Sequence, residues 1–533
     1  MSPPTPPFPS FTTVNFYSGG TLNRLSWLRD DASFLNTALQ QPNTRIVVMQ
    51  NLNPLTYSGK ATEGEEGYLA TMSWNEVKEH VLKAARGSGK ATEDEDVFGP
   101  AAYGVEAPSH LEGRALEAFG KATASIGPTE VAFVFLGVDE EGQEIASLPG
   151  QLATRDGPQE GAEHSSSSNV PAGTPYFALS LTYKSKSVAP SDASPMKPLE
   201  DALVNSGKYD FVDTRALGRA GEWPMRDAAL VAQARALLDW NERNHFCPSC
   251  SRRQYSVWGG YKRACTSSLT KLGVTADVGG SAGHYVKSLM SARALEHDVA
   301  DKEHGECPTT TTLSNCCYPR TDPVVIMGVL SPDGERMLLG RQKKWPPGFW
   351  SCLAGFLEVG ESLEEAVRRE VLEEAGVPIE SVCYHSSQSW PFPSQLMNGA
   401  FGIAKASPGH DLPPIRLDLD NELEAARWYT REEILAVLDS SAKKHFSRQD
   451  VKRIEDAQNH AGGAEQKDPG SIANTDDPKK GAAEVDFKIP PSTAIAHVLI
   501  AAWARKEAIL PLANGTTTES SSAVEKRQQQ SNM

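Results

Sequence analysis

Three glutamates, Glu370, Glu373 and Glu374, lie close together on a segment whose apolar spacing predicts a helix. At about 100° per residue, Ala366 and Val367 lie within roughly 60° of Glu370, so the carboxylates should continue an apolar stripe onto a half-buried face. Carboxylates on such a face repel one another and lose hydration, and they therefore need a counter-charge. With oxygen ligands alone, that charge is best supplied by Mg²⁺ or Mn²⁺.

Both ends of the predicted helix are marked. Ser362 with Glu365 three residues later forms a capping box, and Gly376 is placed to end the helix in the left-handed conformation. The alternative interpretation is an acidic surface helix with ion pairs to Arg368 and Arg369.

The wider pattern favours a catalytic helix. Gly355 is followed after five residues by a glutamate, and after seven more by Arg369-Glu370-aliphatic-x-Glu-Glu-x-Gly-aliphatic. This stretch resembles the signature of the Nudix hydrolases at every fixed position. The resemblance implies a metal-dependent pyrophosphatase acting on a nucleoside diphosphate joined to another group. Carried over to this chain, it implies catalytic roles for Arg369, Glu370, Glu373 and Glu374, and metal ligands at Glu370, Glu374, Glu422 and the carbonyl of Ala354.

An aromatic and proline-rich stretch begins at Ser387 and reads Ser-Gln-Ser-Trp-Pro-Phe-Pro-Ser-Gln. It resembles the Ser-Gln-Pro-Trp-Pro-Phe-Pro-x-Ser array of the NADH pyrophosphatase branch of the family, with departures at Ser389 and Gln395. Such a sequence predicts a stiff extended loop whose flat faces suit a nucleobase, although a packing loop is the alternative. The resemblance implies that the substrate is bound by Tyr318, Phe356, Gln388, Trp390, Pro391, Phe392, Pro393, Gln395 and Ala496. Of these, Tyr318 and Phe356 would sandwich a ring, unless Phe356 is simply part of the core.

Cys247-Pro-Ser-Cys250, followed by Cys265, resembles part of a zinc ribbon. A Cys-x2-Cys turn places two thiolates on one edge of a tetrahedron, and four thiolates would make the zinc structural, because no position stays open for water. Cys307 is the expected fourth ligand, and the other candidates are Cys316, Cys317 and His245. Buried free thiols are the alternative role of a cysteine, expected for Cys352 and Cys383.

Composition narrows the class of protein further. The chain has 533 residues, a formal charge of −16 and a pI of about 5.3, so no overall basic field exists to hold long nucleic acid. An anionic pyrophosphate would need the metal and local cations, of which the nearest in sequence are Arg320, Arg341, Lys343 and Lys344. No apolar run approaches 18 residues, which predicts no membrane span, and the first residues do not resemble a secretory signal. All eight cysteines lie between 247 and 383, which favours a reduced compartment with local metal binding.

The expected fold is α+β. A Nudix-like α+β domain is predicted over 13–240 with polar insertions near 58–95 and 152–174, after a disordered segment 1–12. A zinc ribbon should span 241–319 with an insertion at 266–306. The catalytic α/β/α sandwich should span 320–512 with a disordered insertion at 455–487, before a flexible tail at 513–533.

The family resemblance implies hydrolysis of NADH, and less strongly of NAD⁺, to reduced or oxidised nicotinamide mononucleotide and AMP. Removal of NAD caps from RNA uses the same chemistry. Alternatives are a Nudix hydrolase for another nucleotide such as ADP-ribose, and an inactive zinc-ribbon binding module. The resemblance also implies a homodimer in which Tyr318 enters the partner's site. The final Ser531-Asn532-Met533 resembles a peroxisomal signal, with the cytosol as the alternative location.

Overall fold

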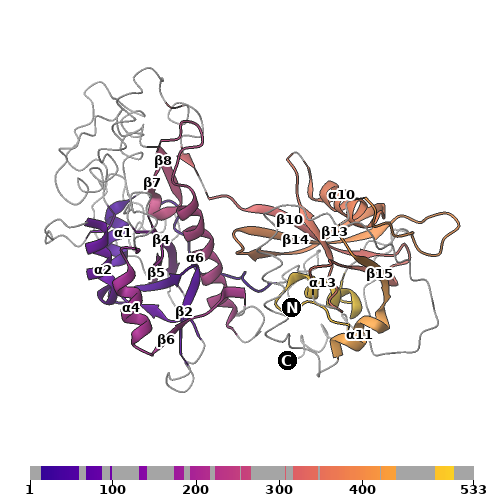
Figure 1. Cartoon of the computed structure of the whole chain (residues 1–533), viewed down its shortest axis with the longest axis horizontal. Helices are drawn as coiled ribbons and strands as arrows, with labels where there is room; N and C mark the ends of the chain where they lie inside the picture. Colours follow the sequence, from indigo (N-terminus) through magenta and orange to yellow (C-terminus); the bar gives the residue numbers. More distant parts are fainter. Residues whose placement is uncertain are drawn as a thin grey trace, which may run out of the picture.

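The computed structural model describes residues 14–29, 31–58, 68–86, 96–98, 131–140, 173–184, 193–215, 223–252, 254–265, 307, 316–317, 319–345, 348–359, 361–419, 422–439 and 487–508. They form two lobes, and the chain enters the second lobe at strand β10 (Asp322–Leu330; Figure 1). Within these ranges, no helix is long and apolar enough to cross a bilayer. The predicted insertion 266–306, most of 455–487 and both terminal segments lie outside the described residues.

The amino-terminal lobe is a sheet of strand order β4-β5-β1-β2-β6, with β3 paired to β1. Strands β1 and β5 are parallel, and the other neighbours are antiparallel. The strands are β1 (Arg45–Gln50), β2 (Asn53–Tyr57), β3 (Thr71–Met72), β4 (Phe133–Asp139), β5 (Thr174–Ser180) and β6 (Tyr209–Phe211). The helices are α1 (Ala32–Leu39), α2 (Trp74–Arg86), α4 (Lys197–Asn205) and α6 (Met225–Arg243).

Successive side chains of β1 point to opposite faces of the sheet and belong to two separate cores of this lobe. Ile46 and Val48 pack with α1, α2 and α4, whereas Val47 and Met49 pack with α6 on the other face of the sheet. The prediction of a polar insertion over 58–95 is therefore wrong for 68–86, which forms β3 and α2. Helix α2 is amphipathic, and its residues Trp74, Val77 and Val81 are buried at helical spacing.

A small antiparallel sheet adjoins this lobe and consists of β7 (Gln254–Val257), β8 (Lys262–Cys265) and β9 (Cys316–Cys317). The tip of its β7–β8 hairpin, the 3-10 turn η1 (Trp258–Gly260), presses onto β4. A Cβ atom at Gly260 would lie 2.3 Å from Cγ1 of Val134, and the φ of Gly260 is +95°, so this close approach requires glycine.

The carboxyl-terminal lobe is a mixed sheet of order β13-β14-β10-β11-β15, with β12 paired to the first half of β10. Its strands are β10 (Asp322–Leu330), β11 (Arg336–Arg341), β12 (Leu353–Phe356), β13 (Ile379–Trp390), β14 (Gln395–Ala404) and β15 (Ala425–Thr430). Its helices are α10 (Leu363–Ala375), α11 (Arg431–Asp439) and α13 (Ile495–Ala504).

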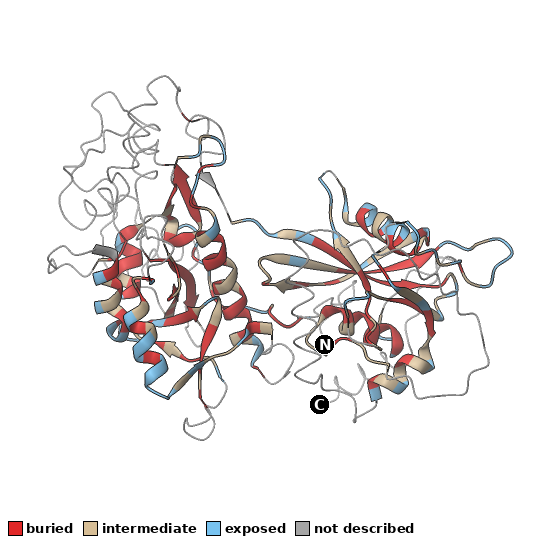
Figure 2. Cartoon of the chain, in the orientation of Figure 1, coloured by how far each residue is buried: buried red, intermediate tan, exposed pale blue. Residues whose placement is uncertain are grey.

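Helix α10 covers one face of this sheet, and α11 and α13 cover the other, which confirms the predicted sandwich (Figure 1). Ile326 and Leu330 of β10 face α13, while Val325, Met327 and Val329 face α10. The buried residues accordingly concentrate along the strands and on the inner sides of the helices (Figure 2).

Candidate active site

Helix α10 begins and ends where the sequence predicts. The Ser362 hydroxyl accepts from the Glu365 amide at 3.3 Å, and the Ser362 amide donates to the Glu365 carboxylate at 2.7 Å. Gly376 ends the helix in the left-handed conformation with φ at 69°. These caps fix the rotation of the helix and therefore which side chains face the sheet.

The three glutamates are not equally buried. Glu374 is 3% exposed, and the Glu370 side chain is 13% exposed. The Glu373 side chain is 51% exposed, so its expected place on the buried face is wrong. The reason is angular, because Glu373 follows Val371 by two residues and points about 160° away from it.

Glu370 lies directly over Gly355 of strand β12. A Cβ atom added to Gly355 would come within 1.9 Å of the Glu370 carboxyl carbon. The spacing between the glycine and the glutamate in the sequence thus has a steric basis, since only a residue without a side chain leaves room for this carboxylate.

Arg369 holds these acids in place. Its guanidinium donates to Glu361 at 2.6 and 2.9 Å, to Glu370 at 2.8 Å, to Glu373 at 3.0 Å and to the Phe356 carbonyl at 2.8 Å. The hydrogen bonds to Glu361 are the main reason that the pKa of Arg369 is raised. These bonds engage all five N–H groups of the guanidinium, so Arg369 positions the carboxylates and the turn after β12.

The oxygen ligands implied by the family resemblance fit a hard divalent cation. Burial raises the pKa of Glu370, and the charges of Glu373 and Glu422 add to this shift, whereas Arg369 opposes it. A cation beside Glu370 would stabilise its ionised carboxylate. Ala354 and Glu422 line the same cavity as Glu370. The carboxylates of the described residues are not clustered as tightly as the sulfurs of Cys247, Cys250, Cys265 and Cys307. Arg369 holds Glu370, and Gln342 donates to Glu422 at 2.6 Å.

A cavity of about 640 Å³ opens beside these carboxylates, a volume suited to a small nucleotide ligand. Its described lining includes Glu358, Glu370 and Glu422 as acids, with Arg369 and Arg215 as cations. The cations expected from sequence proximity, Arg320, Arg341, Lys343 and Lys344, are not among the lining residues.

Phe356 also lines the cavity and is 53% exposed, which contradicts the alternative interpretation that it belongs to the core. Its open face is available to stack on a ring. Tyr318, the expected second ring, lies outside the described residues.

The aromatic stretch closes another side of the cavity. The expected extended loop is wrong, because β13 continues to Trp390 and β14 begins at Gln395, so residues 391–394 form the turn of a hairpin. Trp390, Phe392 and Gln395 line the cavity. The rings of Trp390 and Phe392 meet edge to face at 5.1 Å, and we name them the aromatic corner.

Pro391 and Pro393 are not among the lining residues of this cavity. Pro391 is buried, and its carbonyl accepts from Arg235 at 2.6 Å. Pro393 follows Phe392 through a cis peptide bond. The contact with Arg235 ties the turn of the hairpin to α6 of the amino-terminal lobe.

Gln388 lines the cavity but has a structural task. Its amide donates to the carbonyls of Phe16 at 2.9 Å and Thr493 at 2.8 Å, and its oxygen accepts from the Ile495 amide at 2.9 Å. This last bond caps helix α13, whose own N-cap residue offers no side-chain bond. Gln388 therefore fixes Ala496, also a lining residue, relative to the sheet.

The amino-terminal lobe also reaches the cavity, which sequence reasoning missed. Asn15 donates to the carbonyl of Ser387 at 2.8 Å, and the Ser389 amide donates to the hydroxyl of Ser18 at 3.1 Å. Through this contact Tyr17 becomes a lining residue, and so does Arg215. No motif marks either residue, because each is positioned by segments distant in sequence.

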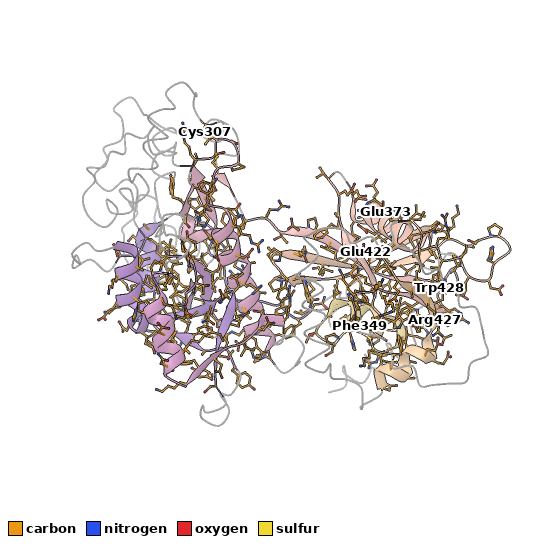
Figure 3. All side chains as sticks on the ribbon, viewed as in Figure 1. Cys307, Phe349, Glu373, Glu422, Arg427 and Trp428 are labelled. Atoms are coloured by element: carbon orange, nitrogen blue, oxygen red, sulfur yellow. The ribbon has the colours of Figure 1, made fainter. Side chains whose placement is uncertain are left out.

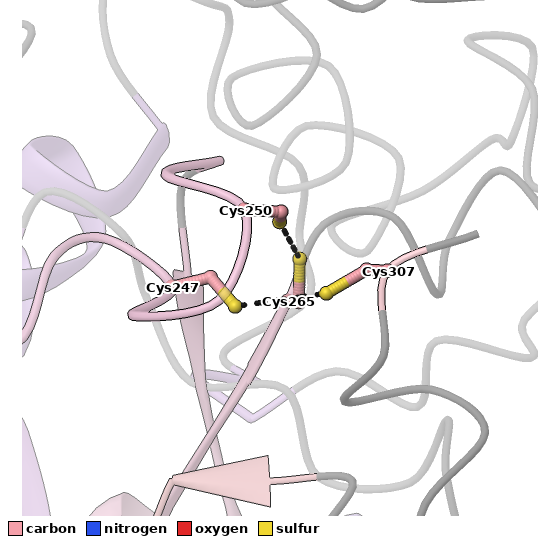
Figure 4. Close-up of side chains that lie close together, drawn as sticks. All are labelled: Cys247, Cys250, Cys265 and Cys307. Carbon is pink, nitrogen blue, oxygen red and sulfur yellow. Dashed lines mark hydrogen bonds between the residues drawn. The ribbon is translucent and has the colours of Figure 1, made fainter. Parts of the chain in front are cut away.

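The four cysteines that are expected to bind zinc come together at the small sheet beside the amino-terminal lobe. The sulfurs of Cys247, Cys250, Cys265 and Cys307 all lie within 4.8 Å of one another (Figure 4). The separations of 3.7 and 3.5 Å between neighbouring sulfurs exceed a disulfide bond and approach the roughly 3.8 Å expected across a tetrahedral ZnS₄ site. Cys307 is remote from Glu373 and Glu422 (Figure 3), so this site is separate from the carboxylates.

The other cysteines and the histidine take no described part in this cluster. His245 is buried against Tyr183, with ring centroids 5.6 Å apart. The side chains of Cys316 and Cys317 lie outside the described residues. Burial raises the pKa of Cys352 to about 12, and burial also raises that of Cys383, as expected for thiols that hold no metal.

The capped helix α10 directs Glu370 at an aromatic-walled cavity, and this arrangement is consistent with a hydrolase of phosphoric anhydrides. Two family models match the chain, the NUDIX domain over residues 319–449 and the "NADH pyrophosphatase-like rudimentary NUDIX domain" over 43–240. The chain belongs to the Nudix hydrolase family.

Relatives from other organisms are similar to this chain over half of its length or more. The "NAD-capped RNA hydrolase" of Schizosaccharomyces pombe is 32% identical over 80% of this chain and 86% of its own length. The "NAD-capped RNA hydrolase NUDT12" of Macaca fascicularis is 29% identical over 92% of this chain and 73% of its own. The human "NAD(P)H pyrophosphatase NUDT13, mitochondrial" is 30% identical over 53% of this chain and 56% of its own length.

Proposed function

We propose that this protein hydrolyses the pyrophosphate bond of NADH and NAD⁺, giving reduced or oxidised nicotinamide mononucleotide and AMP, and that it removes NAD caps from RNA. The observation that carries the proposal is the placement of Glu370 over Gly355 at the edge of a cavity that also contains Phe356 and the aromatic corner. The names of the relatives support the dinucleotide as substrate.

The residues of the site have different roles in the proposed reaction. A divalent cation held by Glu370, Glu374, Glu422 and the Ala354 carbonyl would neutralise the pyrophosphate and acidify the attacking water. Phe356 binds a ring of the substrate by stacking, and the aromatic corner excludes water from the other wall of the cavity. Arg369 keeps Glu370 and Glu373 oriented during turnover, so that no carboxylate must reorganise as charge develops.

The proposal is tested by comparing kcat/KM for NADH, NAD⁺, ADP-ribose and NAD-capped RNA, each with Mg²⁺ and with Mn²⁺. The wild type should process NADH and capped RNA with higher kcat/KM than ADP-ribose, and Glu374→Gln should process none at a comparable rate. A preference for ADP-ribose would overturn the substrate assignment while leaving the Nudix chemistry intact.

We also propose that the four cysteines hold a structural zinc ion. Support comes from the tetrahedral range of the sulfur separations and from the burial of Cys247, Cys265 and Cys307. Elemental analysis of the purified protein should give about one zinc per chain. A zinc-free protein that melts at the same temperature as the wild type would contradict this role.

We further propose a homodimer in which Tyr318 completes the partner's site, on the strength of the family resemblance. Tyr318→Ala and Glu374→Gln should each be weakly active alone. Mixed dimers of the two variants combine Tyr318 from one chain with Glu374 from the other, and they should regain activity. A monomer by light scattering, or mixtures with no recovery, would exclude this arrangement.

A peroxisomal location stays a proposal, and residues 531–533 lie outside the described part of the chain. A fluorescent protein carrying the last dozen residues should form puncta that coincide with a peroxisome marker. Diffuse fluorescence would favour the cytosol.

A further inference from the structure

A second cavity, of about 450 Å³, lies where the two lobes meet. It and the cavity beside the carboxylates, here called the first cavity, lie on opposite sides of the β13–β14 hairpin. Trp390 and Met397 line the first cavity, whereas Ser389 and Leu396 line the second, because successive side chains of a strand point to opposite faces. Gln395 lines both cavities, so a ligand that extends past this side chain contacts both.

Helix α6 forms the wall of the second cavity that faces the hairpin. Its lining residues Ala229, Ala232 and Ala236 recur at intervals of three and four positions, so they lie on one face of the helix, and their small side chains leave space beside it. The hairpin is held against this helix by the bond from Arg235 to the Pro391 carbonyl. The two walls are therefore fixed relative to each other by contacts between the lobes.

The charge of the second cavity differs from that of the rest of the molecule. Its described lining contains one cation, Arg24, and no carboxylate. The whole chain has 68 acidic and 52 basic residues, and the first cavity alone is lined by Glu358, Glu370 and Glu422. A cationic wall without acids, in an acidic protein, favours an anionic ligand.

Arg24 is directed along the wall of this cavity. Its Nη2 atom lies 3.9 Å from the point that a Cβ atom on Gly20 would occupy, and the Cβ atom of Ala229 lies 3.8 Å from the same point. The guanidinium therefore lies beside α6. The carbonyl of Arg24 accepts from Nε of Arg29 at 3.0 Å, which fixes the backbone of this segment. Within the described part of the chain, the Arg24 side chain has no hydrogen bond or ion pair with a carboxylate.

The polar groups around Arg24 are those that bind phosphate in nucleic acids. Ser394 and Thr321 add hydroxyl groups to the lining, and Gln233 adds an amide that also donates to the Tyr261 hydroxyl at 2.6 Å. Phosphate oxygens of a polynucleotide are bound by arginine together with serine, threonine and glutamine side chains. The lining therefore fits a phosphate ester joined to a substrate in the first cavity.

We propose that the second cavity binds the phosphodiester backbone of an RNA whose NAD cap occupies the first cavity, with Arg24 contacting a phosphate. This inference rests on the proposed removal of NAD caps. The same chemical group, a phosphate ester beyond the pyrophosphate, is also present in NADPH as the 2′-phosphate, so NADPH serves as the comparison substrate.

The first test measures kcat/KM for NADH, NADPH and a short NAD-capped RNA in Arg24→Gln and Arg24→Lys. In Arg24→Gln the value for capped RNA should fall about tenfold, as expected for loss of a hydrogen bond between charged groups, while the value for NADH stays within about twofold of the wild type. Arg24→Lys, which keeps the charge, should restore part of the loss. The plot of log kcat/KM for capped RNA against log salt concentration should become shallower by about 0.7 in Arg24→Gln, the slope expected for one phosphate contact to a single strand.

The second test places a negative charge in the cavity without removing Arg24. Ala236 is half-buried on the lining face of α6, and glutamate and glutamine have similar helix propensities. Ala236→Glu should lower kcat/KM for capped RNA at least about threefold more than Ala236→Gln, which adds the same bulk without the charge. Arg45→Gln is the control for removal of a cation, because Arg45 is an exposed arginine of the same lobe that is not among the lining residues of either cavity.

An equal fall for NADH and capped RNA in Arg24→Gln, or no fall for capped RNA, would overturn the inference. A fall confined to NADPH would assign the second cavity to a ribose phosphate and would also overturn it. A wild type that hydrolyses NADH but leaves capped RNA intact would overturn it as well. A wild type that hydrolyses neither substrate would instead refute the proposed function.

Discussion

Replacement of Gly355 by alanine tests the placement of Glu370 without altering any charge. The new Cβ atom would stand 1.9 Å from the Glu370 carboxyl carbon. Non-bonded carbons lie about 3.5–4.0 Å apart, so the carboxylate must retreat by roughly 1.5–2 Å. A misplacement of about 1 Å in a catalytic group can cost about 100-fold in rate. We therefore expect kcat/KM of Gly355→Ala to fall about 100-fold or more, which corresponds to about 2.7 kcal/mol or more of lost transition-state stabilisation.

The fold should tolerate this change. The backbone of Gly355 is not in the left-handed region, and a glycine-to-alanine change at a compatible position alters stability by about 1 kcal/mol or less. Gly402 of β14 provides the control in the same sheet, because a Cβ atom there would meet Ile379 at 3.4 Å, an ordinary contact.

Steady-state hydrolysis of NADH and thermal melting would be measured for both variants. Gly402→Ala should retain the wild-type kcat/KM, and both variants should melt within a few degrees of the wild type. A fully active Gly355→Ala would refute the steric account of why this glycine precedes the helix.

Four further predictions concern single residues. Glu374→Gln keeps the shape of a buried side chain but removes its charge, so kcat should fall by orders of magnitude while circular dichroism stays unchanged; near-normal turnover would exclude Glu374 as a ligand. Phe356→Ala removes an exposed ring whose stacking contributes roughly 1–3 kcal/mol, so KM for NADH should rise about tenfold, and an unchanged KM would exclude stacking. Burial lowers the pKa of His385, so the unfolded chain binds more protons below about pH 6.5 and stability should fall on acidification; His385→Gln should show a shallower fall in melting temperature between pH 7 and 5, and identical pH profiles would refute this. Cys307→Ser should lose zinc and lower the melting temperature, and full zinc content would assign the fourth ligand elsewhere.

Local signals were sufficient to predict helix α10. The capping box at Ser362, the terminating Gly376 and the apolar stripe containing Ala366 and Val367 depend on neighbours within four residues, and all are present in the structure. The fold class follows from the order of such elements. Helix α2 was missed because it lies between polar segments that dominated the composition of its region.

The parts that could not be predicted depend on distant segments. The bond between Asn15 and Ser387 joins residues 372 positions apart, and Tyr17 reaches Thr214 across 197 positions. No periodicity or motif encodes either pairing; the first arises only when the two lobes are docked, and the second only when the amino-terminal lobe is folded. The same holds for Gln388, whose sequence context marks a substrate ligand but whose amide caps helix α13 in the folded chain.

The most direct test of the central claim is the identity of the products. Mass spectrometry of a reaction of the purified protein with NADH and Mg²⁺ should reveal reduced nicotinamide mononucleotide and AMP in equal amounts, with Glu370→Gln forming neither at a comparable rate. Intact NADH after prolonged incubation of the wild type with Mg²⁺ or Mn²⁺, or an equal product yield from Glu370→Gln, would contradict the account.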